Sequence, residues 1–390
     1  MKTAIVTSAR IFYDGKDYKI DNGINFVLER YQKYFGEITL FGMDGKDKGI
    51  APRSTSIIDS SVNVKIVGSR NQIIFGLLDV DFNQELLGFD LIIVRSPSKL
   101  ADIAARVAMR NNIPYFVEVI GDAFDSLWFH SIMAKPFAFF SFFRTRRTVL
   151  NADFALYVSQ KFLQIRYPCK NYSVGISDCI VNPISEPELE KKTAEIIRES
   201  YSSISIMHAG AVDVKYKGQE YIIKAIPLLN QQGITVRLYL AGNGNLSYLK
   251  EVALKNGVSD QIIFLGGIAH DEIIRNMKNI DFYVQPSLTE ALGRSVVEAL
   301  SQGMICIGTD VGGIPELIHK DYLVKPKSAK DIFNKIMDFL SLSPENKRLI
   351  IERNVQHSKN YQIDKLDSKR NNYYKYVLSE LKKESDFEED

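Results

Sequence analysis

Two carboxylates and a set of backbone amides occur close together in the C-terminal half of this chain. Glu290 lies in the turn before a predicted helix over 293–302, and Glu298 lies inside that helix. The amides of Leu292 and Gly293 fall at the helix N-terminus, where N–H groups have no partner within the helix and attract anions. Gly293 also lets a ligand approach the backbone closely. The pattern predicts a binding site for a phosphate or for sugar hydroxyls.

The elements around this site alternate between short apolar strands and amphipathic helices, a pattern typical of parallel, doubly wound sheets. In this half we predict strands at 204–208, 236–241, 262–265, 282–285 and 304–308, and helices at 219–231, 247–256, 271–278, 293–302 and 329–340. Because open parallel sheets bind ligands at the carboxyl ends of their strands, we expect a ligand at the loops that follow these strands.

The N-terminal half repeats the alternation, with strands predicted at 3–8, 38–41, 62–67, 91–94, 115–119 and 154–158 and helices at 24–35 and 99–111. Two such series predict the α/β class, with two Rossmann-like doubly wound parallel-sheet domains facing a cleft. We expect an N-terminal domain over 1–182 and a C-terminal domain over 201–360. A linker over 183–200 is indicated by prolines and a charged run, and a long helix with an acidic end by residues 361–390.

The composition is that of an ordinary globular protein, with 45% hydrophobic and 25% charged residues. The net charge of +2 gives no support to nucleic acid as a partner. The cysteines, Cys169, Cys179 and Cys306, show no metal-ligand spacing, which predicts free thiols in a reducing compartment. No stretch has the length and apolar character of a membrane span, and the N-terminus does not resemble a signal peptide, so we expect a cytoplasmic protein.

Five motifs of the C-terminal half, taken together, resemble those of the retaining glycosyltransferases of family four, which have the GT-B fold. They are Pro286-Ser followed by Glu290, Glu298 and Gly303; the turn Asp310-Val-Gly-Gly-Ile-Pro-Glu316; the loop Leu240-Ala-Gly-Asn-Gly244; the pair Lys217-Gly218; and the loop Phe264-Leu-Gly-Gly267. Each motif is weak alone, but all of them in the same order and spacing are specific. The resemblance covers 204–326 well, and the N-terminal half only in layout.

The resemblance implies a role for each matching residue. Glu298 would bind the ribose hydroxyls of a nucleotide, and Glu290 would bind hydroxyls of the donor sugar. Lys217 would neutralise the diphosphate leaving group. The other donor-binding residues that it implies are Gly23 at the start of the first helix, Gly242 and Gly266 in the glycine loops, and the amides of Leu292 and Gly293.

The sequence departs from the family pattern in two places. Where the family has a Gly-Arg pair, this chain has Gly210-Ala211, so Lys215 or Arg294 would supply the second positive charge at the diphosphate. Where the family often has a histidine after the fourth strand of the N-terminal domain, this chain has none, and Glu118 or Asp122 would serve instead on the acceptor side.

The resemblance implies transfer of a hexose-type sugar, with retention of configuration, from a nucleoside-diphosphate sugar to a glycan or lipid-linked acceptor, as in surface polysaccharide synthesis. Negative charge develops on the departing diphosphate, where cations and helix amides can stabilise it. We therefore expect catalytic roles for Lys217, Glu290 and Arg294, with no metal and with the nucleotide sugar as a co-substrate in place of a cofactor. The resemblance also implies that the last helix returns to the N-terminal domain.

Other functions fit part of the pattern. A sugar-nucleotide epimerase or a phosphorylase can have the same two-domain plan, although no lysine motif for pyridoxal phosphate is evident. A non-catalytic sugar-nucleotide-binding subunit fits the missing arginine and histidine. A dinucleotide dehydrogenase is disfavoured because Ser8-Ala-Arg-Ile-Phe12, without a glycine motif, follows the first strand. Glu290 and Glu298 could also form no more than a solvated helix face.

Three further features have both a structural and a functional interpretation. Phenylalanines and arginines dominate 137–147, which fits either a buried helix beneath the N-terminal sheet or a segment that dips into a membrane and binds anionic headgroups. Asp79-Val80-Asp81 matches the metal signature of the other main glycosyltransferase fold, but we interpret it as a surface turn. His208, at a strand end, is expected to be a core histidine rather than a base.

Overall fold

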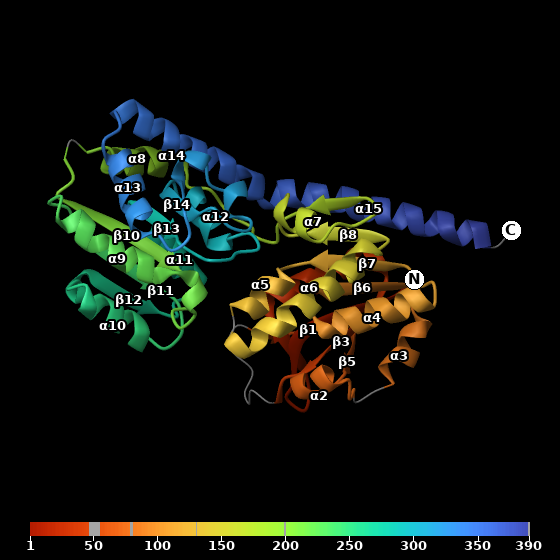
Figure 1. The fold of residues 1–390 in the computed structure, drawn as a ribbon. Helices are drawn as coiled ribbons and strands as arrows, with labels where there is room; N and C mark the ends of the chain where they lie inside the picture. The colour runs from red at the N-terminus through yellow and green to blue at the C-terminus, as the bar shows by residue number, and fades with distance from the viewer. Residues whose placement is uncertain (47–54, 79–80, 130, 199, 389–390) are drawn as a thin grey trace. The chain divides into compact units, whose positions relative to one another are not determined.

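The protein divides into two compact α/β units (Figure 1). The computed structural model describes residues 1–46, 55–78, 81–129, 131–198 and 200–388. Unit 1 comprises Met1–Ile176 and Ser368–Asp390, and unit 2 comprises Ser177–Asp367. Each unit contains a mainly parallel sheet, so the predicted α/β fold class with two such sheets is confirmed.

Unit 2 contains a parallel sheet whose strand order is β12-β11-β10-β13-β14-β15. Its strands are β10 (Ser203–Ala209), β11 (Thr235–Ala241), β12 (Ile262–Gly266), β13 (Phe282–Gln285), β14 (Ile305–Thr309) and β15 (Leu323–Val324). The chain builds outward from β10 to β12 and then returns to place β13 on the other side of β10. The point between β10 and β13 is therefore the topological switch point of this sheet, where open α/β sheets bind ligands.

Helices precede, connect and follow the strands of unit 2. They are α8 (Glu186–Ile196), α9 (Gln219–Asn230), α10 (Ser247–Lys255), α11 (His270–Met277), α12 (Arg294–Ser301), α13 (Ala329–Leu340) and α14 (Pro344–Ser358), with short 3₁₀ turns at Lys215–Lys217, Ser259–Gln261, Ile314–Glu316, Lys320–Tyr322 and Lys359–Tyr361. In α9, Ile222, Ile226 and Leu229 recur at helical spacing and are fully buried. Such a stripe buries one side of a helix against the sheet.

Unit 1 contains a parallel sheet with a short antiparallel extension. Its strands are β1 (Lys2–Tyr13), β2 (Tyr18–Asp21), β3 (Glu37–Asp44), β4 (Thr55–Ile57), β5 (Asn63–Ile66), β6 (Leu91–Ser96), β7 (Tyr115–Val119), β8 (Phe154–Tyr157) and β9 (Ser173–Gly175). The parallel part has the order β5-β3-β1-β6-β7-β8-β9. The end of β1 pairs antiparallel with β2, which pairs with β4.

The helices of unit 1 are α1 (Asn22–Phe35), α2 (Arg70–Phe75), α3 (Phe82–Glu85), α4 (Lys99–Arg110), α5 (Ala123–Trp128), α6 (Lys135–Leu150) and α7 (Phe162–Arg166), with 3₁₀ turns at Leu86–Gly88 and Ile132–Ala134. Asp81 caps α3 by accepting a hydrogen bond from the amide of Gln84. The rest of the Asp-x-Asp string, residues 79–80, lies outside the described residues. In the described part of the chain, no helix has the length and apolar character needed to cross a bilayer.

The last helix, α15 (Ile363–Glu388), belongs to unit 1 from Ser368 onward. The hydroxyl of Tyr373 accepts a hydrogen bond from the backbone amide of Ala155 at 2.9 Å. The ring of Tyr374 packs 5.2 Å from that of Phe35 and 5.8 Å from that of Tyr31, measured between centroids. The two buried tyrosines therefore complete the aromatic core of unit 1.

The boundary between the units differs from the expected position. The segment 183–200, predicted as a linker, contains α8, and both Leu189 and Ile196 are buried in the core of unit 2. The prolines and charges that suggested a linker begin a helix, because proline suits the first helical turn and Ser185 forms a capping box with Glu188.

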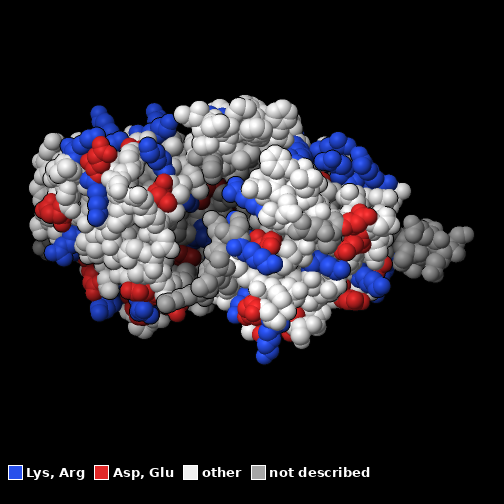
Figure 2. All heavy atoms as spheres, turned by 90° about the horizontal axis from the view of Figure 1, so that it is seen from below, with Lys and Arg blue, Asp and Glu red and all other residues white. Residues whose placement is uncertain are grey.

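Charged side chains of both signs share the surface. On the face drawn in Figure 2, Lys and Arg lie among Asp and Glu over much of the area. This distribution agrees with the small net charge of the chain.

Candidate active site

The predicted donor residues of unit 2 follow the strands that flank the switch point. β10 ends at Ala209 and is followed by the 3₁₀ turn that carries Lys217. β13, its neighbour in the sheet, ends at Gln285 and is followed by the turn that carries Glu290. The two residues are thus brought to one edge of the sheet although 73 positions separate them in sequence.

Lys217 and Glu290 form an ion pair, with 2.6 Å between Nζ and Oε1. The same Oε1 accepts hydrogen bonds from Nε2 of Gln285 at 2.8 Å and from Oγ of Ser287 at 2.9 Å. Gln285 and Ser287 are buried, whereas the Lys217 and Glu290 side chains keep 21% and 14% exposure. The two buried side chains therefore fix the position of the Glu290 carboxylate. The Lys217–Glu290 ion pair is still partly exposed, so an incoming ligand can reach it.

Two glycine-containing loops hold the turn over 286–292 in place. Leu288 donates its amide hydrogen to the carbonyl of Tyr216 at 2.7 Å, and Gly313 donates to the carbonyl of Glu290 at 3.0 Å. Gly312 has a positive φ of 57°, and a Cβ there would overlap the carbonyl oxygen of Glu290. Only glycine suits both this backbone conformation and this close approach.

The N-terminus of α12 faces the end of that turn. Gly293 occupies the capping position in a left-handed conformation, with φ of 98°, and the helix begins at Arg294. The side chain of Leu292 is buried, so its backbone amide is the polar group that it contributes. The structure thus places the amides of Leu292 and Gly293 at a helix N-terminus, as the sequence predicts.

Glu298 lies inside α12 and is buried, with 7% exposure. Its Oε1 lies 3.1 Å from Nε2 of His270, the first residue of α11. The hydrogen bond to Glu298 raises the pKa of His270 above its usual range, against the opposite effect of desolvation. The sequence motifs did not identify His270 as part of the site. Its position just after the Phe264-Leu-Gly-Gly267 loop is the signal that could have identified it.

The two candidate cations besides Lys217 have different surroundings. Nζ of Lys215 lies 4.5 Å from the ring centroid of Tyr248, which is a cation–π contact. Arg294 lies in the first turn of α12, where partial desolvation of the guanidinium lowers its pKa, but Asp178, Cys179 and Glu298 together raise the pKa above its usual value. Of the two, Arg294 lies nearer in the chain to the amides at the start of α12.

His208 is a fully buried residue of β10, as the core interpretation expects. Its Nδ1 lies 2.9 Å from the carbonyl oxygen of Val284, and burial lowers its pKa to about 4, with a smaller lowering by Lys217. The ring is therefore neutral near pH 7, with the proton on Nδ1. Among the residues that the structure describes, Nε2 has no hydrogen-bond partner.

The glycine loops meet at the same edge of the sheet. Gly242 donates its amide hydrogen to the carbonyl of Gly266 at 2.8 Å, and a Cβ on Gly242 would overlap the carbonyl of Gly210. The structure thus brings together the ends of β10, β11 and β12. Of these loops, the one at Gly210 lies closest to the ion pair, because a Cβ there would lie 3.6 Å from Cδ of Lys217.

Three predicted residues belong to unit 1, and the structure gives each an internal partner. The amide of Gly23 donates to Oδ1 of Asp21, the cap of α1, at 2.9 Å. The expectation that this amide is presented to a diphosphate therefore needs correction, because the capping carboxylate already accepts its hydrogen and would repel an anion.

The carboxylates of Glu118 and Asp122 are also occupied. Oε2 of Glu118 lies 2.6 Å from Nε of Arg95, and both side chains are buried. Asp122 pairs with Arg166 and accepts the amide hydrogen of Asp125 at 2.8 Å, which caps α5. A structural role accounts for both carboxylates, and an acceptor-side role stays a prediction.

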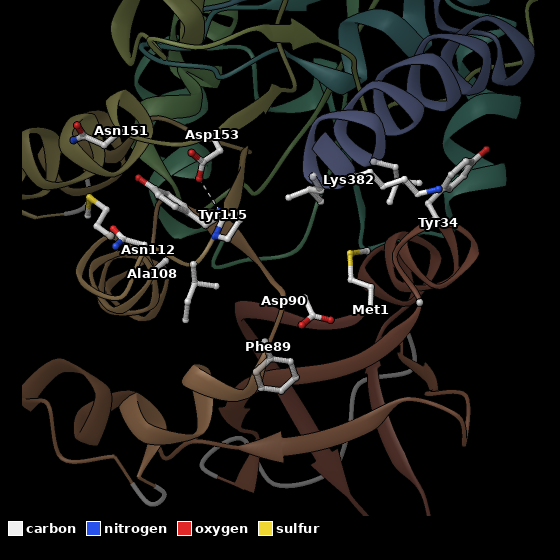
Figure 3. A pocket seen from close by; sticks show the side chains of 16 residues that line it. Met1, Tyr34, Phe89, Asp90, Ala108, Asn112, Tyr115, Asn151, Asp153 and Lys382 are labelled. Carbon is white, nitrogen blue, oxygen red and sulfur yellow. Dashed lines mark hydrogen bonds between the residues drawn. The ribbon is translucent and has the colours of Figure 1, made fainter. Parts of the chain in front are cut away.

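A cavity of about 1240 Å³ in unit 1 does not coincide with the predicted site. It lies at the amino ends of the strands, lined by Met1 before β1, Asp90 before β6, and Tyr115 at the start of β7, with Lys382 of α15 (Figure 3). Ligands of parallel sheets bind at the opposite edge, and none of the predicted site residues lines this cavity.

The comparisons with known proteins agree with this description. The family model described as Glycosyl transferases group 1 matches residues 205–356, which contain every predicted donor residue of unit 2. Protein CapJ of Staphylococcus aureus is 32% identical over 327 residues, covering 82% of this chain and 80% of CapJ. The gpi3 subunit of phosphatidylinositol N-acetylglucosaminyltransferase from Schizosaccharomyces pombe is 29% identical over 209 residues, covering 48% of this chain and 46% of its own.

Solved structures show the same fold along almost the whole chain. Sucrose-phosphate synthase from Thermosynechococcus elongatus matches with a TM-score of 0.67 and 16% identity, covering 97% of this chain and 99% of its own. HepE of Anabaena in complex with UDP-glucose matches with a TM-score of 0.64 and 18% identity. The match covers 97% of this chain and 100% of the HepE chain. At such identities the likeness concerns the fold alone.

The contact between Gly312 and Glu290 yields a stability prediction. Gly312→Ala should lower the free energy of unfolding of unit 2, because the methyl group must displace the turn that carries Glu290. Gly257→Ala is the matched control: Gly257 also has a positive φ, of 67°, but a Cβ there would meet nothing within 4 Å. We expect a loss of about 1–2 kcal/mol for the control and about 1–3 kcal/mol more for Gly312→Ala. Denaturant titration would measure both, and equal losses would contradict the close packing.

Proposed function

Since the chain belongs to the glycosyl transferases group 1 family and is a glycosyltransferase, we propose that it transfers a hexose with retention of configuration. The proposed donor is a nucleoside-diphosphate sugar, and the proposed acceptor is a glycan or a lipid-linked glycan of a surface polysaccharide. The observation that carries the proposal is the Lys217–Glu290 pair, held by Gln285 and Ser287 at the switch point of unit 2.

The proposed donor site uses the geometry of α12. The diphosphate would lie at the amides of Leu292 and Gly293, within reach of the Lys217 ammonium group, and the sugar hydroxyls would bind Glu290. The ribose would bind Glu298 inside the helix. As the bond from the anomeric carbon to the diphosphate breaks, negative charge grows on the leaving group. Cations and amides already in place stabilise that charge without reorganising.

Two kinds of similarity support the choice of substrates. HepE, a neighbour in fold, has been solved with UDP-glucose. The gpi3 relative is named as part of an enzyme that acts on phosphatidylinositol, which is a lipid acceptor. A nucleotide-sugar donor and a lipid-linked acceptor are therefore the substrate classes to test first.

The direct test is a panel of nucleotide sugars in a thermal-shift assay on the full chain. A true donor present at one hundred times its dissociation constant should stabilise the fold by roughly 2.7 kcal/mol. Failure of every nucleotide sugar to raise the melting temperature would refute the proposal. An epimerised nucleotide sugar formed without acceptor would identify an epimerase instead.

Glu298 should control nucleotide affinity, and His270 should make that affinity depend on pH. Glu298→Ala removes a charged hydrogen bond to ribose and should weaken binding by roughly 1.5–3 kcal/mol. Below the raised pKa of His270, its imidazolium pairs with Glu298 and must be displaced. Affinity should therefore rise as pH increases through that pKa.

Isothermal titration of the donor across this pH range would measure the effect, with His270→Ala expected to flatten the profile. His319→Ala is the control, because it removes another exposed histidine of unit 2 that lies beside a carboxylate, Asp321, at 3.1 Å. A slope that persists in His270→Ala would exclude this competition.

The second positive charge at the diphosphate is proposed to come from Arg294. Its guanidinium can hold two phosphate oxygens at once, and it begins the helix whose amides would bind the same group. Lys215 is the alternative, but its ammonium lies over the ring of Tyr248.

Steady-state kinetics of Arg294→Ala and Lys215→Ala separate the two residues. Arg294→Ala should lower kcat by roughly 100-fold, as removal of one preorganised transition-state donor does, with a smaller rise in KM. Lys215→Ala should stay near normal. The reverse pattern would assign the role to Lys215, and normal turnover in both variants would place the charge elsewhere.

Activity should survive a chelator. In the proposed mechanism, Lys217 and the α12 amides stabilise the leaving diphosphate, and this removes the need for a divalent cation. The measurement is turnover in EDTA against turnover with added magnesium or manganese. Complete loss in EDTA that either metal restores would reverse this expectation.

A further inference from the structure

Helix α6 of unit 1 buries small residues and exposes large apolar ones, which is the reverse of an ordinary amphipathic helix. Its buried positions are Ala138, Ser141, Thr145, Thr148 and Val149, most of them small. Its exposed apolar residues are Phe137 at 63%, Phe139 at 51%, Phe140 at 72% and Phe143 at 64%. A helix that only supports a sheet buries its large apolar residues instead.

The preceding 3₁₀ turn extends the same kind of surface. Ile132 and Met133 are 82% and 86% exposed, which makes them the most exposed large apolar residues in the described part of the chain. Together with the four exposed phenylalanines of α6 they form what we term the aromatic face. Exposed large apolar residues that gather along one segment of chain mark an interaction site more often than isolated exposed residues do.

Polar contacts hold α6 in unit 1. Thr148 donates its hydroxyl hydrogen to Oδ1 of Asp102 in α4 at 3.0 Å, and Arg144 forms an ion pair with the same carboxylate. Phe139 alone of the exposed phenylalanines packs against α5, with its ring centroid 5.1 Å from that of Phe124 and 6.0 Å from that of Trp128. Phe143 contacts only the edge of the neighbouring Phe142, with 5.3 Å between ring centroids, and no ring contact with the described residues accounts for Phe137 or Phe140.

Positive charge follows directly after the aromatic residues. Phe140, Phe143 and Arg147 succeed one another along one side of the helix, and Arg146 and Arg147 are both exposed. From 126 to 152 the sequence contains no Asp or Glu. Of the carboxylates near this stretch, Asp102 and Asp125 are paired with Arg144 and Arg166, and Asp153 accepts the amide hydrogen of Tyr115 at 2.9 Å.

We infer that the aromatic face and the arginines beside it bind unit 1 to the surface of an anionic bilayer. The phenylalanines would enter the boundary between headgroups and acyl chains, with α6 lying in the plane of the surface. Arg146 and Arg147 would reach lipid phosphates, which guanidinium groups bind with two hydrogen bonds at once. A bilayer offers apolar and anionic layers at adjacent depths, and this matches the arrangement on α6 better than a uniformly apolar partner would.

The inference deepens the proposed function and rests on it in one respect, because a lipid-linked acceptor would lie at the surface that unit 1 binds. Membrane binding itself needs neither donor nor acceptor, so it can be tested alone. The full chain would be sedimented with vesicles of phosphatidylcholine and with vesicles that also contain phosphatidylglycerol. We expect binding to the anionic vesicles, and weaker binding as salt is raised.

Two pairs of substitutions test the two parts of the surface. Phe140→Gln with Phe143→Gln should weaken binding to anionic vesicles at least tenfold. Arg146→Gln with Arg147→Gln should weaken it roughly fivefold per residue and reduce its salt dependence. Phe75→Gln is the control, because Phe75 is an equally exposed phenylalanine of unit 1, at 77%, away from α6. It should bind as the unchanged protein does.

A second variant guards against an effect on folding. Ile132→Gln with Met133→Gln alters the face outside α6 and should weaken vesicle binding in the same direction, with an unchanged circular-dichroism spectrum. The inference is overturned if the unchanged protein ignores anionic vesicles, or if either apolar pair binds them normally. It is also overturned if light scattering shows a dimer that these pairs dissociate, since the face would then join two copies of the chain.

Nucleotide binding separates this inference from the proposed function. Each variant should keep the thermal shift produced by the donor sugar, because α6 lies in unit 1 and the donor residues lie in unit 2. Vesicle binding without any nucleotide binding would refute the glycosyltransfer proposal and leave the membrane contact standing. Nucleotide binding without vesicle binding would refute the membrane contact and leave the glycosyltransfer proposal standing.

Discussion

The candidate site depends on the close packing of one turn, Pro286–Leu292, between two loops that contain glycine. A Cβ on Gly218 would overlap the carbonyl oxygen of Pro286, and one on Gly312 would overlap that of Glu290. The backbone of the turn is therefore in direct contact with the backbone of both glycine loops, one on each side. Because protein interiors yield little to added volume, this packing sets the position of Glu290 and, two residues on, of the amides before α12. Lys217 reaches the same carboxylate because it precedes Gly218.

Most strands and helices of unit 2 were predictable because they have a strong and repeated signal, although α8, α14 and β15 were not predicted. Its strands alternate with helices in the order that a doubly wound sheet requires, and the predicted bounds differ from the observed ones by a residue or so. Short elements carry less information, so β2 and β4 of unit 1 were missed. Segment 183–200 was assigned to a linker, because its few apolar residues, among them Leu189 and Ile196, are too widely spaced to stand out from its charges.

The partners of the site residues were less predictable than the residues themselves. Glu290, Glu298 and Lys217 stand in recognisable motifs, but their contacts depend on tertiary packing across 28 and 73 positions. Gln285 did carry a signal, since it is a polar residue at the end of an otherwise apolar, buried strand. No local pattern indicated that Asp21 would cap α1 and occupy the amide of Gly23, because a capping carboxylate and an anion-binding loop use the same residue types.

The division of unit 1 into two segments has a consequence for how the chain is made. Its aromatic core around Phe35 and Phe116 is completed by Tyr373 and Tyr374, which are translated only after the whole of unit 2. Unit 2 is continuous and can form as soon as it emerges. At synthesis rates of about 5–20 residues per second, the N-terminal segment waits roughly 10–40 s for its missing helix while unit 2 is translated. The N-terminal segment of unit 1 is thus synthesised before unit 2, but its aromatic core can close only after unit 2 has been translated.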